Sequence, residues 1–337
     1  MDPLLIGAIA VIAVALVFDY TNGFHDAANA IATSVSTRAL TPRIALGMAA
    51  VGNFVGAHFG GAVAKTVGDG VVSLPQGAEA LGVVAAGVLG AIGWNLITWY
   101  FGIPSSSSHA LIGGMVGATL CSIAFGVGGS VKWGDILRKI VIPMIASPIA
   151  GFILGALAML AVMWLFRHGH PGKLNRGFRI AQSFSAAAMS VGHGMQDAAK
   201  TMGIIVLALY TAQLQDSNTH IPEWVYWASA TALALGTYAG GWRIIRTLGR
   251  RVIHLDPPAG FAAETVASSV LWVNSQLGLP ISTTHTITSA IMGVGATKKL
   301  SAVRWGVAGN IVIAWILTFP GAALIAVISY FLVRPFF

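Results

Sequence analysis

The sequence has very few charged residues and a single cysteine. Charged residues make up 9% of its 337 positions, whereas an ordinary soluble domain has about 25%. So few charges cannot cover a water-facing surface, which excludes a soluble enzyme. Cys121 alone forms neither an internal disulfide nor a cysteine metal cluster. The alternating strand pattern of a membrane β-barrel is also missing.

Apolar residues are abundant instead. Hydrophobic residues make up 56% of the chain, the mean hydropathy is +0.78, and 41 glycines suit close helix packing in lipid. These values exclude a disordered chain and predict an all-α polytopic protein of the cell inner (plasma) membrane. The net charge of +8 does not indicate nucleic acid, because the basic residues lie in short loops between apolar spans. We expect the lipid bilayer as a partner and no nucleic acid.

Some apolar segments read as simple membrane spans and others as interrupted ones. Simple spans need about 20 apolar residues and are expected at 44–64, 81–101, 136–166, 224–240 and 303–332. The run 4–18 is short and meets a polar stretch, and 181–209 contains several polar residues, so we expect helix breaks there. Segments 81–101 and 259–277 are each followed by Gly-x-Pro and a second apolar run, which is typical of re-entrant hairpins or broken helices.

The chain also repeats itself. Residues 22–29 align with 193–200, and residues 102–109 align with 278–285, in the same order in both halves. The matches include Asp, His and Pro, so the bias towards Gly and Ala does not explain them. We therefore predict two repeats, 1–165 and 178–337, joined by a basic cytoplasmic linker, 166–177.

The loop charges predict how these repeats are oriented. Excess Lys and Arg marks the cytoplasmic side, which places four basic regions there: 38–43, 167–179, 243–251 and 298–304. The acidic loops 69–79 and 216–223 then lie outside, so the two repeats have opposite orientations, as in inverted-repeat transporters. Loop 128–139 carries three basic residues on the outer side and does not follow the rule.

Two aspartates, Asp26 and Asp197, occupy matching positions inside apolar sequence. A charge within the membrane costs about 2.5–3.5 kcal/mol on insertion scales, so it indicates a functional site. The pair favours a cation or proton site over a simple hydrogen bond between helices. Their polar neighbours complete the candidate coupling site: His25, Asn29, Gln196 and Lys200. Lys200 replaces Asn29 of the first repeat, where an ammonium neutralises Asp197, occupies a sodium position, or attracts an anion.

Two hydroxyl-rich turns are candidate anion sites. The hydroxyls follow Pro104 in the first repeat and Pro280 in the second: Ser105, Ser106, Ser107, Ser108, Ser282, Thr283 and Thr284. Each turn opens a helix, and a helix N-terminus offers unpaired N–H donors and partial positive charge to phosphate or sulfate. The alternative is simple helix capping. His109 and His285 close the two turns as gates, proton carriers or hydrogen-bond partners.

These motifs resemble a known family. The segments Asn22-Gly23-Phe24-His25-Asp26-Ala27-Ala28-Asn29 and His193-Gly194-Met195-Gln196-Asp197-Ala198-Ala199-Lys200, with the paired Pro-x-Ser-x-Ser/Thr-His turns, resemble the duplicated signatures of the inorganic phosphate transporter (PiT) family. The resemblance implies an inverted-repeat symporter that carries inorganic phosphate, has no cofactor, and forms a homodimer. It assigns phosphate to the hydroxyl turns, and the coupling cation to the aspartate motifs, with Asp26, Asn29 and Asp197 as the Na⁺ ligands. We also expect Asn22 to contact phosphate.

The departures from that family pattern bear on the coupling ion. His25, Gln196 and Lys200 replace asparagines of the motifs, and Lys200 resembles the bacterial low-affinity members, which couple to protons and accept a metal–phosphate complex. We therefore favour H⁺ coupling, with Na⁺ symport and sulfate transport as alternatives. Walker and G-x-S-x-G motifs are missing from the sequence, so neither ATP coupling nor hydrolase chemistry is expected.

Overall fold

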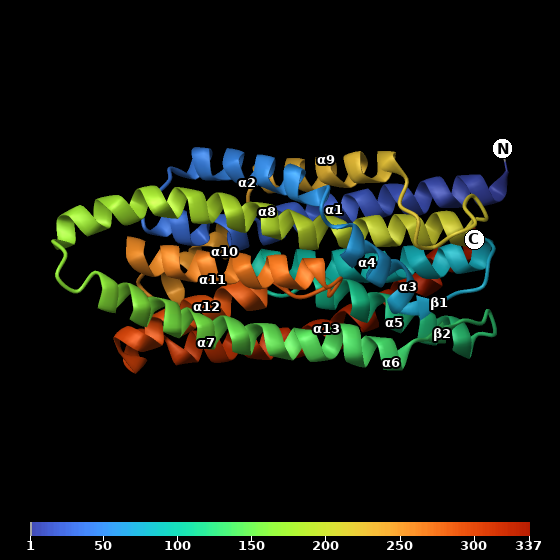
Figure 1. The fold of residues 1–337 in the computed structure, drawn as a ribbon. Coiled ribbons are helices and arrows are strands. Elements are labelled where there is room, and N and C mark those ends of the chain that lie inside the picture. Colours follow the sequence, from blue (N-terminus) through green and yellow to red (C-terminus); the bar gives the residue numbers. More distant parts are fainter. Residues whose placement is uncertain (1) are drawn as a thin grey trace.

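A computed structural model describes residues 2–337, apart from the side chain of Arg250. Long helices lie roughly side by side in an elongated bundle (Figure 1). The first half of the chain supplies the following elements: α1 (Pro3–Ser36), α2 (Pro42–Ala57), α3 (Gly61–Gly70), β1 (Val72–Ser73), α4 (Ala78–Phe101), α5 (Ser107–Ala124), β2 (Ser130–Val131), α6 (Trp133–Asp135), η1 (Ile136–Val141) and α7 (Ile142–Leu165).

The second half of the chain is also almost entirely helical. Its elements are α8 (Pro171–Thr211), α9 (Glu223–Ala239), α10 (Trp242–Arg246), η2 (Thr247–Arg251), α11 (Pro257–Gln276), α12 (Thr283–Lys298), η3 (Leu300–Ala302), α13 (Trp305–Val333) and η4 (Arg334–Phe336). The two short strands pair antiparallel, with Val72 opposite Val131. The all-α membrane architecture is confirmed: within residues 2–337, five helices are long and apolar enough to cross a bilayer, and α2 and α3 form a further pair bent by 68°.

The helix breaks predicted at the two aspartates are wrong. Asp26 lies inside the uninterrupted α1, and Asp197 inside the uninterrupted α8. Neither polar stretch contains proline, so nothing removes a backbone hydrogen bond. The polar side chains of these stretches are buried against neighbouring helices, where a membrane protein tolerates them. Helix α8 begins at Pro171, within the predicted linker 166–177.

The breaks predicted at Pro104 and Pro280 are present. Helix α4 is followed by Gly102 with φ of 65°, and α11 is followed by Gly278 with φ of 67°, a left-handed conformation that favours glycine. After each proline a new helix begins, and α5 packs against α4 as α12 packs against α11. The two tips touch, because Ser108 Oγ donates to the Ile281 carbonyl at 3.1 Å.

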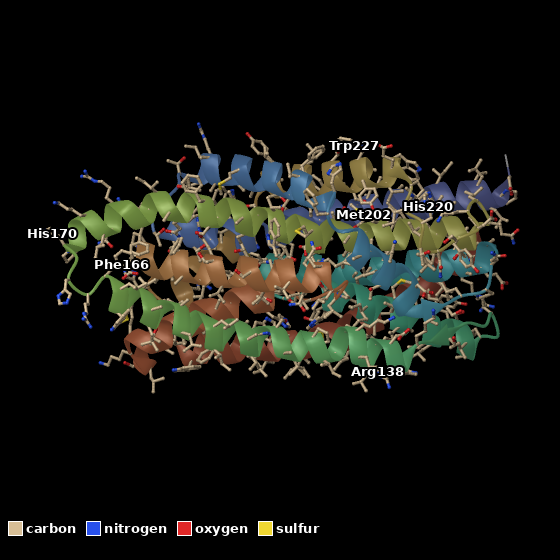
Figure 2. All side chains as sticks on the ribbon, viewed as in Figure 1. Arg138, Phe166, His170, Met202, His220 and Trp227 are labelled. Atoms are coloured by element: carbon tan, nitrogen blue, oxygen red, sulfur yellow. The ribbon has the colours of Figure 1, made fainter. Side chains whose placement is uncertain are left out.

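The two ends of the bundle carry the loops that the charge pattern separates. Phe166 and His170 lie at one end and His220 near the other, together with both chain termini (Figure 2). Lys132, in the loop that departs from the charge rule, donates to Asp69 at 2.8 Å. That ion pair neutralises the basic side chain beside an acidic residue predicted on the same side.

Glycines allow α1 and α9 to approach closely. A Cβ on Gly236 of α9 would overlap the Tyr20 carbonyl of α1, and a Cβ on Gly23 would overlap the Leu233 carbonyl. Because these obstacles are backbone atoms, they cannot move aside. Such a crossing fixes the position of α1, which carries Asp26.

This crossing gives a stability prediction. We expect Gly236→Ala to lower the melting temperature in detergent, because overpacking costs about 1–3 kcal/mol. Gly309→Ala is the matched control, since among residues 2–337 no atom lies within 4 Å of its added Cβ. Thermal unfolding followed by size-exclusion chromatography measures both variants. Equal melting temperatures for the two would contradict the packing described.

Candidate functional site

The two sequence-predicted aspartates meet in the protein interior. Asp26 of α1 is 2% exposed and Asp197 of α8 is fully buried. Together with His193 of α8, they present one ligand atom each, all within 4.8 Å of one another. Carboxylate and imidazole atoms at this spacing are able to share a cation or a proton, so this cluster is the centre of the candidate site.

Asp26 links α1 to both hydroxyl turns. Its Oδ2 accepts a hydrogen bond from Ser107 Oγ at 2.8 Å, and Thr284 Oγ1 lies 3.4 Å from its Oδ1. His25 Nδ1 lies 2.7 Å from the same Oδ1. The His25 ring is itself held from its other side, because its Nε2 lies 3.0 Å from Thr98 Oγ1. The Asp26 carboxylate therefore contacts the tips of both hairpins.

Asp197 is held mainly by cationic or ionisable groups on its own helix. Lys200 Nζ donates to its Oδ1 at 2.8 Å, and His193 Nε2 lies 3.0 Å from its Oδ2. Asn22 Nδ2 reaches the same Oδ2 at 3.4 Å. The spacings of three and four residues place these side chains on one face of α8. The buried carboxylate is thus neutralised by an ammonium from its own helix.

Lys200 also joins this carboxylate to the first hydroxyl turn. Its Nζ donates to Ser107 Oγ at 3.0 Å and to Ser108 Oγ at 3.1 Å. Lys200 is 2% exposed. These two contacts, together with the one to Asp197, use all three donors of the ammonium. An anion at the Ser107 and Ser108 hydroxyls would therefore meet a buried positive charge.

The hydroxyls of each turn divide into two kinds. Ser106 and Ser282 are N-caps, since their Oγ atoms accept from the backbone N–H of His109 and of His285 at 3.2 and 3.1 Å. The next hydroxyls face the aspartate cluster. In the second turn, Asn29 Nδ2 donates to Thr283 Oγ1 at 3.1 Å and to Thr284 Oγ1 at 2.8 Å.

Two sequence-predicted residues lie beside the cluster and support it. Gln196 braces the second turn, because its Nε2 donates to Ser275 Oγ at 3.0 Å and its Oε1 accepts from Ile281 N at 3.2 Å. Ser105 Oγ donates to Thr98 Oγ1 at 2.8 Å. These two side chains therefore hold the turns in place and do not face the space between the two aspartates.

The two histidines that follow the turns contact each other. The ring centroids of His109 and His285 are 4.4 Å apart, and His285 stacks on Trp315 at 3.8 Å. Within the part of the chain that the structure describes, both ring nitrogens of His109 and Nε2 of His285 have no hydrogen-bond partner. They line a cavity of about 580 Å³ that is otherwise apolar.

Sequence reasoning missed two buried carboxyls. Glu264 of α11 accepts from Thr33 Oγ1 and Ser185 Oγ, both at 2.5 Å, and from Gln182 Nε2 at 3.1 Å. Asp19 of α1 is fully buried. Each is a single acidic residue in an otherwise apolar run, which is the signal that marked Asp26 and Asp197, but neither has an acidic match in the other repeat.

The fold and this site define a class of protein: a polytopic helical membrane transporter with a buried polar site where two hairpin tips meet. The chain matches the phosphate transporter family over residues 22–176 and 166–326. It belongs to that family, and the prediction of a multi-pass membrane transporter rather than an enzyme is confirmed.

Individual relatives agree with this assignment. The chain is 49% identical over 330 residues to a probable low-affinity inorganic phosphate transporter of Rhizobium meliloti (strain 1021), covering 98% of this chain and 96% of the relative. It is 45% identical over 340 residues to one of Bacillus subtilis (strain 168), with both chains fully covered. A solved structure described as the sodium-dependent phosphate transporter shares the fold, with a TM-score of 0.88 and 24% identity over 99% of this chain and 100% of that chain.

Proposed function

We propose that this phosphate transporter imports inorganic phosphate together with protons. The observation that carries the proposal is the Lys200 ammonium, which bridges Asp197 and the Ser107 and Ser108 hydroxyls. An ammonium at that position neutralises the carboxylate without a metal ion. Protons then supply the positive charge that is transported together with the phosphate anion.

Phosphate in this proposal sits between the two hydroxyl turns. The Ser107, Ser108, Thr283 and Thr284 hydroxyls donate to its oxygens, while the N-termini of α5 and α12 add partial positive charge. Lys200 supplies the full charge, and Asn22 lies at the edge of the cluster. The caps Ser106 and Ser282, with Ser105, hold the turns in place.

Na⁺ symport is the second candidate, and a specific observation favours it. Asp26, His193 and Asp197 present ligand atoms close enough for one cation. Within the described residues, the amide oxygens of Asn22 and Asn29 have no hydrogen-bond partner, and such oxygens suit a hard cation. The same ligands would accept the metal of a metal–phosphate complex.

The repeats provide a route for alternating access. We propose that 1–165 and 178–337 are inverted repeats, that the α4–α5 and α11–α12 hairpins enter from opposite faces, and that the site forms where their tips meet. His109 and His285 lie one helical turn beyond the caps and would gate the passage. We also propose a homodimer, which native mass spectrometry in detergent tests directly.

Uptake of radiolabelled phosphate into proteoliposomes tests the proposed function. We expect uptake to follow an acid-outside gradient in the absence of Na⁺. Strict dependence on Na⁺ would replace the proton by sodium as the coupling ion. Excess sulfate distinguishes the remaining alternative, because it should leave phosphate uptake unchanged unless the hydroxyl turns accept both anions. We expect the affinity for phosphate to be low, because these relatives are named low-affinity transporters.

The two kinds of serine in the first turn give a matched prediction. Ser107→Ala removes a donor to Asp26 and a contact of Lys200, so we expect phosphate uptake to fall about tenfold, the effect of about 1.4 kcal/mol. Ser106→Ala removes a cap, which costs about 0.5–2 kcal/mol of stability but no anion contact. Uptake and melting temperature are measured for both. A larger loss of uptake in Ser106→Ala would reverse the roles proposed.

A further inference from the structure

Asp19 is a buried carboxyl that the proposed site does not use. It lies in α1, three residues before Asn22 and seven before Asp26, and these spacings place all three side chains on one face of the helix. Seven residues span about 10 Å of helix. Asp19 therefore lies on the N-terminal side of the aspartate cluster, toward the end of the bundle with the chain termini (Figure 1).

The surroundings of Asp19 favour a neutral acid. Its side chain is fully buried, and neither carboxyl oxygen has a hydrogen-bond partner among residues 2–337. The Thr201 hydroxyl of α8 lies near it and has no other partner within the described residues. An ionised carboxylate without partners is far more costly to bury than a protonated one. Asp197 differs from Asp19, because the Lys200 ammonium lies beside it as a partner.

The charged groups that act on Asp19 lie in the transport site. They are Asp197 and Lys200, both on α8. The other helices packed on this part of α1 are α4 and α9, whose charged residues are Glu79 and Glu223, each in the first turn of its helix. A phosphate that engages Lys200 offsets its positive charge and adds negative charge nearby, so it favours the protonated form of Asp19.

We propose that Asp19 is a proton carrier of this transporter, loaded from the outer side as phosphate engages Lys200 and unloaded after phosphate has left the site. This inference rests on the proposed proton symport and assigns its proton to a residue. On loading, an external hydronium ion gives up a proton: one of its O–H bonds breaks, an O–H bond forms on a carboxylate oxygen of Asp19, and water is left. On unloading, that bond breaks, the electron pair stays on the oxygen, and water of the inward-open site takes the proton.

The test compares two modes of transport in proteoliposomes. Asp19→Asn keeps the shape of the protonated acid but carries no exchangeable proton. We expect it to exchange internal for external phosphate within about twofold of the wild-type rate, and to lose at least tenfold of the uptake driven by an acid-outside gradient. Asp19→Glu should retain the response to the gradient. Asp69→Asn, at a half-exposed carboxyl paired with Lys132, is the matched control and should behave as wild type.

The outcomes separate this inference from the proposed function. If wild-type uptake ignores the proton gradient, proton symport itself fails, and this inference fails with it. If the wild type responds and Asp19→Asn responds equally, proton symport stands and Asp19 is not its carrier. Should Asp19→Asn not fold, labelling of the wild type with a hydrophobic carbodiimide decides. A protonated Asp19 is modified at acid pH and spared at alkaline pH, and modification that does not change with pH contradicts the proposal.

Discussion

Asp197→Asn is expected to abolish phosphate uptake while the protein still folds. The amide has the shape of the carboxylate, and its oxygen still accepts from Lys200, so the contacts within α8 survive. The negative charge is lost. Lys200 then carries an uncompensated positive charge in the interior. When phosphate leaves, the Lys200 ammonium has no carboxylate to which it can return. We expect initial uptake to fall at least about a hundredfold, which corresponds to about 2.7 kcal/mol.

Uptake in proteoliposomes and monodispersity in detergent check this prediction together. Asp135→Asn is a matched control, because Asp135 is half-exposed and pairs with Lys139 four residues on. Such a surface pair contributes little, so its removal should leave uptake unchanged. Full activity of Asp197→Asn would exclude this carboxylate from coupling.

Lys200→Met should produce a loss of similar size through phosphate binding. Methionine keeps most of the side-chain length but removes the ammonium that contacts Ser107, Ser108 and Asp197. A hydrogen bond to a charged group contributes about 1.5–3 kcal/mol, so losing the ammonium contacts should weaken phosphate binding about a hundredfold or more. The variant should also be less stable, because breaking a buried ion pair costs about 3–5 kcal/mol.

A double variant separates these two effects. Asp197→Asn with Lys200→Met removes both charges, and replacing a whole buried pair is often neutral for stability. We expect the melting temperature to return toward that of the wild type while uptake stays lost. A double-mutant cycle on both quantities measures the coupling. Phosphate affinity of Lys200→Met equal to that of the wild type would show that the ammonium is structural only.

Much of this architecture could be predicted because its signals are local. Pro104 and Pro280, each preceded by a Gly-x step and followed by hydroxyls, specify a helix end and a new helix start, and both are present. The matching positions of Asp26 and Asp197 indicated one shared cluster, and the structure brings their ligand atoms together.

What the sequence could not predict depends on helix rotation and on partners far away in the chain. Polar residues around Asp26 suggested a helix break, yet α1 continues because neighbouring helices bury those side chains. Successive hydroxyls in a turn point about 100° apart, so the difference between the cap Ser106 and the inward-facing Ser107 is fixed by packing. Asp19 shows the same limit, since its lack of partners is a property of the assembled bundle.

The most direct test of this account is a structure determined with phosphate present. The account predicts anion density between the two hydroxyl turns, within hydrogen-bond distance of Ser107, Thr284 and the Lys200 ammonium. Arsenate in place of phosphate would identify the anion by its anomalous signal. Density at the basic end of the bundle alone, with the space between the turns closed and Lys200 still on Asp197, would contradict it.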